Sequence, residues 1–183
     1  MTTFDFGAGP VPAHRHTNPD GTEGGWVADT AKVAPTAYVG PTAQVHDHAR
    51  VDGHARVFDT ARVFGHARVY GEAEIYGNAQ VYGFAQVSDN AQVYGEALVY
   101  GDAWVYGNAR IHDNALVYDF ARVFDHAEAR GHARVYEGAL VAGYAMIAGY
   151  TLVNDGWESR KASITGRTRN PDTRGQEGRR NGT

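Results

Sequence analysis

Two arginines and two histidines gather within one stretch of the chain, at Arg110, His112, Arg130 and His132. Guanidinium and imidazole groups donate hydrogen bonds to phosphates and carboxylates, so such a cluster can attract a small anion such as a nucleotide. Glu128 lies in the same stretch, and an ordinary ion pair between strands explains these residues without a ligand. Arg110 and Glu128 are 18 positions apart, and so are His112 and Arg130. Either interpretation therefore needs a fold that brings residues at this spacing side by side.

Two groups of histidines could bind a metal ion, but each group contains only two histidines. His48 and His66 are 18 positions apart, but the next residue of that series is Phe84, and a metal site needs three or four ligands. The segment 14–16, His-Arg-His, is equally small. We therefore expect no histidine metal site.

Asp119, Glu137 and Asp155 form an acidic series at the same spacing. Three stacked carboxylates could hold calcium, or Arg134 nearby could relieve their repulsion. We favour the second account and predict that the protein binds no metal.

An internal repeat predicts the elements that position these side chains. Alanine occupies every sixth position from Ala31 to Ala145, twenty times in a row, and Val or Ile follows two positions later in every unit but one. The exception is Ala129. Gly25-Trp26-Val27 and Thr151-Leu152-Val153 extend the frame at its two ends. The unit reads Ala-x-Val-x-Gly/Asp-x, as in AQVYGE and ALVYGD.

Each unit predicts one short strand and one turn. Alanine and valine are two apart, so a strand points both inward, while the residues that flank valine point outward. Gly or Asp two places after valine suits a corner, because Gly tolerates positive φ and Asp can bond to the backbone nearby. A strand this short cannot bury its apolar face alone, so the units must wrap into stacked coils. The expected fold is an all-β solenoid.

The Ala-x-Val spacing over residues 25–156 resembles the hexapeptide-repeat proteins that form a left-handed parallel β-helix. The resemblance implies three strands and 18 residues per coil, about seven coils, and a left-handed winding that opposes the usual crossover rule. The GGWV start and the VYGN and VYGD units are most similar to uncharacterised hexapeptide proteins of phages and prophages, a group without an established activity.

Residues 18 apart then stack in columns on the outer faces. One face presents an unbroken aromatic column directly after the core valines: His46, Phe64, Tyr82, Tyr100, Tyr118 and Tyr136. Rings in such a column can simply stack along the sheet, can form an interface between subunits, or can hold a carbohydrate or a base. The sequence leaves these three alternatives open.

The irregular unit at Ala129 lies inside the arginine and histidine cluster. One coil earlier, Arg110 should stand beside Glu128, and His112 beside Arg130. A break in a consistent pattern is a place to seek function, so we predict the ligand site there.

The two ends differ from the repeat. Residues 1–24, rich in Pro and Gly, are expected to form an irregular N-terminal cap. Residues 157–183 hold seven basic and three acidic residues, so this segment is predicted to be a flexible basic tail in which Trp157 could cover the last coil. The net charge of this tail is +4. Because the whole chain carries -4, residues 1–156 carry -8, which argues against nucleic-acid binding outside the tail.

The chain has no cysteine, signal-peptide pattern or membrane-length apolar run, so we expect a cytoplasmic protein.

Two functions compete. The resemblance implies acyltransferases that use CoA or acyl-carrier substrates between the subunits of a trimer, with a histidine as general base. Here His112 is the best match and His132 the second. The repeat never slips between Ala31 and Thr151, however, so no loop projects to build an acceptor pocket. We therefore expect a non-catalytic binding solenoid without a cofactor, forming a homotrimer that binds a host protein or a small anion; a rigid spacer is the remaining alternative.

Overall fold

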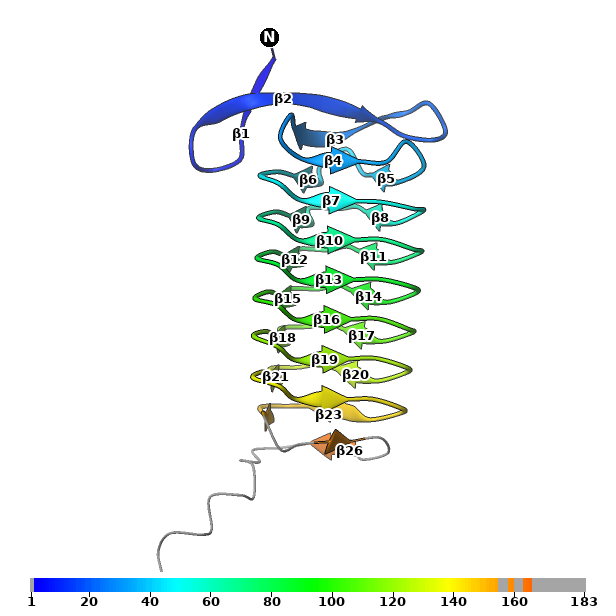
Figure 1. The fold of residues 1–183 in the computed structure, drawn as a ribbon, viewed down its shortest axis with the longest axis vertical. Helices are drawn as coiled ribbons and strands as arrows, with labels where there is room; N and C mark the ends of the chain where they lie inside the picture. The colour runs from blue at the N-terminus through cyan, green and yellow to red at the C-terminus, as the bar shows by residue number, and fades with distance from the viewer. Residues whose placement is uncertain (1, 155–157, 160–162, 166–183) are drawn as a thin grey trace, which may run out of the picture.

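The computed structural model describes residues 2–154, 158–159 and 163–165 of the 183 residues. The strands form three sheets, which we call sheets I, II and III. Each coil of the chain contributes one strand to each sheet, and Figure 1 shows the coils stacked as a tall prism. The prediction of an all-β solenoid with three strands per coil and about seven coils is confirmed.

The strands are short, and most contain two residues. Sheet I contains β1 (Thr3–Asp5), β2 (Pro10–Thr17), β3 (Glu23–Ala28), β6 (Gln44–Val45), β9 (Arg62–Val63), β12 (Gln80–Val81), β15 (Leu98–Val99), β18 (Leu116–Val117), β21 (Arg134–Val135) and β24 (Leu152–Val153). Sheet II contains β4 (Lys32–Val33), β7 (Arg50–Val51), β10 (Arg68–Val69), β13 (Gln86–Val87), β16 (Trp104–Val105), β19 (Arg122–Val123), β22 (Leu140–Val141) and β25 (Glu158–Ser159). Sheet III contains β5 (Tyr38–Val39), β8 (Arg56–Val57), β11 (Glu74–Ile75), β14 (Gln92–Val93), β17 (Arg110–Ile111), β20 (Glu128–Ala129), β23 (Met146–Ala148) and β26 (Ser163–Thr165).

Parallel partners stand 18 residues apart along the prism. Trp26 pairs with Gln44 at its start, and Arg134 pairs with Leu152 near its end. In the last pair of sheet III the interval falls to 17, where Met146 pairs with Ser163. The regular register therefore ends where the sequence repeat ends.

The winding is left-handed, as the family resemblance implies. In Figure 1 the chain descends from β7 at the front to β8 behind on the right and β9 behind on the left, and then returns to the front at β10. A chain that moves away from a viewer at the top while turning anticlockwise traces a left-handed coil.

The interior contains almost only alanine and the branched residues that follow it. From Ala37 to Val141 the inward alanine and Val or Ile of each unit are completely buried and form one continuous cluster. Alanine leaves room next to a corner, and the branched side chains fill the space between the three sheets. Burial of this apolar surface holds the coils together.

The corners use residues with positive φ. Glycine takes this conformation at most corners, and Asp takes it at six others, with φ between 54° and 59°. At those corners the Asp carboxylate accepts a hydrogen bond from the backbone N–H of the corner residue one coil later, as Asp89 does from Gly107 at 3.0 Å. An aspartate corner therefore adds a bond between coils that a glycine corner lacks.

Replacing Asp89 tests this corner bond. Asp89→Ala should lower the free energy of unfolding by about 1–2 kcal/mol, because it removes the bond to Gly107 and leaves a β-carbon at positive φ. Asp89→Gly removes only the hydrogen bond, so it should lower the free energy of unfolding by less. Asparagine keeps an acceptor and tolerates this φ, so the stability of Asp89→Asn should stay near that of the wild type. Urea denaturation of the three variants gives the comparison. Equal losses in the alanine and glycine variants would show that the backbone conformation costs nothing here.

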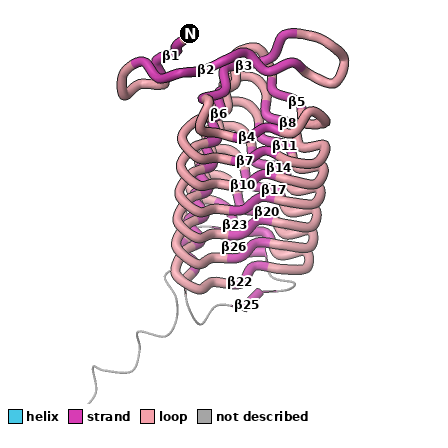
Figure 2. Tube along the Cα trace, turned by 45° about the horizontal axis from the view of Figure 1, so that its top comes forward, coloured by secondary structure: helices cyan, strands magenta, loops and turns pink. Residues whose placement is uncertain are grey.

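The segment before the repeat is more regular than the irregular cap predicted for it. β1 and β2 pair antiparallel, and β2 pairs antiparallel with β3. Figure 2 shows this hairpin lying across the N-terminal end of the solenoid. Pro10 and Pro12 are accommodated because they lie in a short terminal ladder, where a missing N–H is tolerated.

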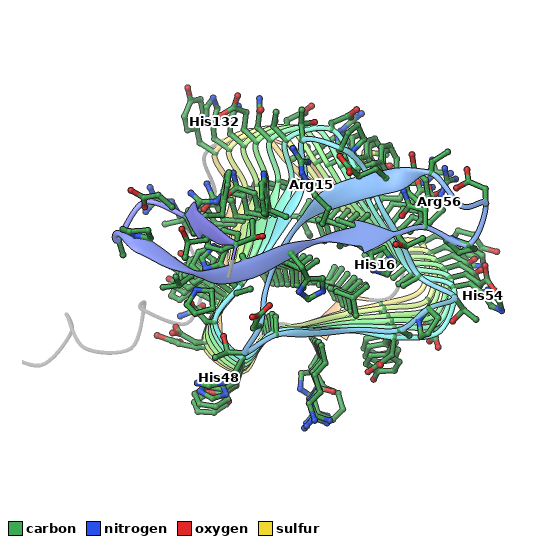
Figure 3. All side chains as sticks on the ribbon, turned by 90° about the horizontal axis from the view of Figure 1, so that it is seen from above. Arg15, His16, His48, His54, Arg56 and His132 are labelled. Carbon is green, nitrogen blue, oxygen red and sulfur yellow. The ribbon has the colours of Figure 1, made fainter. Side chains whose placement is uncertain are left out.

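Polar side chains of the cap replace the missing coil above sheet III. Buried His16 points toward the middle of the prism in Figure 3, and its Nε2 lies 3.0 Å from Ala37 O. Buried Asn18 accepts a hydrogen bond from Val39 N at 2.9 Å. These backbone groups face the side from which a preceding coil would bond, so the cap blocks further strand addition at this edge.

The predicted tail, residues 157–183, and the predicted cover by Trp157 lie outside the described residues except for β25 and β26. In the part of the chain that the structure describes, there is no helix of the length and apolarity needed for a membrane span.

Candidate functional site

The aromatic column predicted from the sequence is present on sheet I. Its rings stack almost in parallel, with centroids 4.8 to 5.3 Å apart and interplanar angles of 2° to 9° from Phe64 to Tyr136. Burial raises the pKa of Tyr82, Tyr100 and Tyr118, so these phenols stay neutral. The rings therefore stack along the sheet, and they are half-buried rather than fully exposed.

The N-terminal hairpin continues this column. Buried Phe6 stacks on His46 with centroids 4.8 Å apart, and His46 stacks on Phe64 at 4.9 Å. Arg62 donates a hydrogen bond to Phe6 O, which holds the hairpin against sheet I. Burial lowers the pKa of His46, which favours a neutral ring in the stack. Cap and solenoid therefore share one aromatic ladder.

The predicted anion patch on sheet III is organised around an acid. Glu128 Oε1 lies 3.1 Å from His112 Nε2 and 3.4 Å from Arg130 Nε. His112 Nδ1 lies 3.2 Å from Asp113 Oδ1. Hydrogen bonds from the side chain of His112 and the backbone of Gly131 lower the pKa of Asp113. Both ring nitrogens of His112 thus face carboxylates.

The four residues predicted to bind an anion do not converge. Arg110 pairs in register with Glu128, as expected from the spacing, but the carboxylate bonds to His112 and Arg130. His132 stands on the next corner, where Figure 3 shows it pointing away from the prism, and its ring stacks on Tyr150 with centroids 4.7 Å apart. Glu128 thus contacts His112 and Arg130 instead of the Arg110 expected from the spacing, and these side chains surround an acid rather than a space for an anion.

One ion pair on sheet III joins two neighbouring coils. Arg56 Nη1 lies 3.2 Å from Glu74 Oε1, one coil below it. On sheet III, Arg56 is thus neutralised by an acid from the neighbouring coil, whereas Arg130 pairs with Glu128 of its own coil. This arrangement provides a comparison for the other faces.

The histidines and acids considered as metal ligands do not lie next to further ligands in the described residues. His48 and His66 stack with centroids 5.1 Å apart, and Phe84 continues their column at 4.9 Å. Asp119 accepts a backbone hydrogen bond from Glu137 N, and Asp155 lies outside the described residues. Among the residues that the structure describes, no group of three or more His, Asp or Glu side chains could hold a metal ion.

A groove that the sequence columns missed runs along the corner between sheets I and II. Its volume is about 630 Å³. The residues His48, Arg50, His66 and Arg68 line its N-terminal half, and Phe84, Gln86, Asp102 and Trp104 line the other half. Four of these residues, Arg50, Arg68, Gln86 and Trp104, directly precede a core valine on sheet II, and the other four form the adjoining corner column. Comparing both positions at 18-residue intervals finds the groove.

Comparison with known proteins supports the repeat architecture. The family model described as "YdcK Beta solenoid repeat" matches residues 91–107. No curated protein and no solved structure matches the chain. The matched segment contains β14 to β16, one strand of each sheet, so the chain is a β-solenoid repeat protein by both its geometry and this match.

Proposed function

We propose that this protein is a non-catalytic binding solenoid of phage or prophage type, which holds a partner or ligand on its outer faces. The uninterrupted register carries this proposal. Parallel strands follow one another at 18-residue intervals from β3 to β24, so no inserted loop encloses a substrate. The surface offers columns and shallow grooves along the axis instead. The phage affiliation is supported by the GGWV start and the VYGN and VYGD units.

The surroundings of His112 support binding over acyl transfer. A general base needs a ring nitrogen free to accept a proton from the acceptor group. In this protein both nitrogens of His112 lie close to carboxylates, and its side chain is only 13% exposed. His132 stacks on Tyr150 at a corner, and it forms no ion pair with an acid among the residues that the structure describes.

A thermal-shift assay separates the two functions. We expect acetyl-CoA to leave the melting temperature of the protein unchanged. Stabilisation by acetyl-CoA that disappears in His112→Ala would favour the acyltransferase instead. Capture of partners from host lysate on the immobilised full chain then identifies what the solenoid holds, and the absence of any partner or ligand would favour a rigid spacer.

A homotrimer through the aromatic column is part of the proposal. The column forms a continuous apolar strip on one face, which suits a symmetric interface. Light scattering should give a mass three times the 19.8 kDa of one chain. Tyr100→Arg, in the middle of the strip, should produce the monomer because it buries a charge in the interface.

Tyr94→Arg is the matched control for this test. Tyr94 stands in an equivalent stacked column on sheet III, with Tyr76 and His112 at 4.8 and 4.7 Å. Its replacement disturbs ring stacking equally but should leave the trimer intact. A wild-type protein with the mass of one chain would contradict the trimer.

A further inference from the structure

Arg50 and Arg68 line the N-terminal half of the groove between sheets I and II, and Lys32 precedes them on the same face. Lys32, Arg50 and Arg68 are consecutive in one outward column of sheet II, one coil apart. All three are exposed, and within the described residues none of them forms an ion pair. On sheet III, by contrast, Arg56 is paired with Glu74.

Like charges on directly opposed residues repel each other and destabilise a sheet. Neutral Gln86 continues the column, so the fold itself does not require a cation at this position. A column of uncompensated cations therefore fits a bound anion. Beside it, His48 and His66 add imidazole groups that can donate further hydrogen bonds.

The other half of the groove presents flat rings. Phe84 is 59% exposed and Trp104 is 43% exposed, which are high values for residues of this size. Phe84 ends a stack that begins with His48 and His66, because Asp102 occupies the next position of the corner column. One face of the Phe84 ring is therefore not covered by a ring from the following coil.

This corner column has no ring at the level of Asp102, and the spacing leaves room for one there. The next aromatic residue of this corner column is Phe120, 67% exposed and two coils beyond Phe84, which corresponds to about 10 Å at the spacing of β-strands. Rings in the columns of this protein repeat at 4.7 to 5.3 Å, so a single planar ring between Phe84 and Phe120 continues the ladder. The Asp102 carboxylate at this level can accept hydrogen bonds from ring N–H or amino groups.

From these two halves we infer that the groove binds a nucleoside polyphosphate. Its base stacks on Phe84 at the level of Asp102, and its phosphates contact Arg68 and Arg50, about 10 to 15 Å away at the spacing of β-strands. This inference rests on the proposed binding function and names its ligand and site. The site lies on sheet II, away from the arginine and histidine cluster on sheet III.

The charge pattern favours one free nucleotide over a nucleic-acid chain. Lys32, Arg50 and Arg68 occupy three successive coils of this column, and the next cation, Arg122, follows only after Gln86 and Trp104. Asp102 lies in the half of the groove that lacks cations. A chain of phosphates needs cations along its whole path, and residues 1–156 carry a net charge of -8.

Isothermal titration of the full chain with ATP, GTP, tripolyphosphate and oligothymidylate tests the inference. We expect a purine nucleotide to bind more tightly than oligothymidylate. The double variant Arg50→Gln/Arg68→Gln should weaken nucleotide and tripolyphosphate binding by about 100-fold or more, because each arginine contributes a charged hydrogen bond. Glutamine already occupies this column at Gln86, so the variant is compatible with the fold.

Two variants at the other end separate base from phosphate. Phe84→Ala and Asp102→Ala should weaken nucleotide binding by about 10-fold through lost stacking and base contacts, while tripolyphosphate binding stays unchanged. Equal loss for both probes would show that these residues do not contact a base. Tighter binding of oligothymidylate than of any mononucleotide would overturn the assignment to a free nucleotide.

Arg110→Gln is the matched control on sheet III and should leave nucleotide binding unchanged. If Arg110→Gln abolishes nucleotide binding while the groove variants do not, the groove assignment fails but the binding function stands. If no nucleotide binds, the groove inference fails alone, because lysate capture still tests the binding function independently.

Discussion

Gly25→Ala is expected to detach the N-terminal hairpin from the solenoid. Gly25 is buried in β3 at the position that alanine occupies in the following units. A β-carbon there would lie 2.5 Å from Gly40 O and closer still to Ala43 O, and both are backbone atoms that cannot turn aside. We expect a loss of about 3 kcal/mol or more, since overpacking against a rigid backbone forces the strand to move.

The loss should stay near the N-terminus. In a solenoid each coil contacts only its neighbours, so displacement of β3 mainly exposes the first coil. Hydrogen exchange should accelerate at Val39 N, which Asn18 protects, and remain slow at Val99 in the middle of the prism. Urea denaturation gives the corresponding change in unfolding free energy.

Ala43→Gly is the matched control one coil further. It introduces glycine at the equivalent position and should cost only about 1 kcal/mol, chiefly through backbone entropy. If Gly25→Ala is no more harmful than Ala43→Gly, the close approach of β3 to the first coil is not required for folding.

Glycine at residue 25 also illustrates where sequence reasoning ends. The repeat frame could be extended to Gly25-Trp26-Val27 because the spacing continues. The reason for glycine depends on the path of the hairpin, which has no repeat of its own. Likewise the pairing of Asn18 with Val39 joins residues whose spacing follows no period.

The columns could be predicted well because stacking is periodic. Once 18 residues form a coil, the neighbours of Tyr100 follow from arithmetic, and the structure places Tyr82 and Tyr118 on either side of it. Contacts that cross between columns do not follow from this spacing. Glu128 bonds to His112 and Arg130 rather than to Arg110 because side-chain reach and rotamer decide among several nearby partners.

The groove was missed for a related reason. Its two walls come from different positions of the repeat unit, a corner residue such as His66 and an outward strand residue such as Arg68. Each column alone looks ordinary. Only the angle between a corner and the adjoining face makes a concave surface from them.

Ala129→Val is expected to stabilise the protein. Ala129 lies in the core of sheet III between Ile111 and Ile147, its partners in the neighbouring coils. Val93 has the corresponding surroundings, between Ile75 and Ile111, and is completely buried there. The same backbone therefore accommodates valine between two isoleucines, so we expect Ala129→Val to add about 1–2 kcal/mol by filling space in the core.

Val93→Ala is the converse change and should cost about 2–3 kcal/mol, from lost burial and the cavity left behind. Urea denaturation of both single variants and of the double variant gives the comparison. Ile111 contacts both sites, so any departure from additivity in the double variant reports coupling through this shared neighbour. A loss of stability in Ala129→Val would mean that the coil has closed around the alanine. A gain of stability would mean that Ala129 is not needed for stability. The break in the repeat would then need another reason, and the nearest candidate is the position of Glu128 between His112 and Arg130.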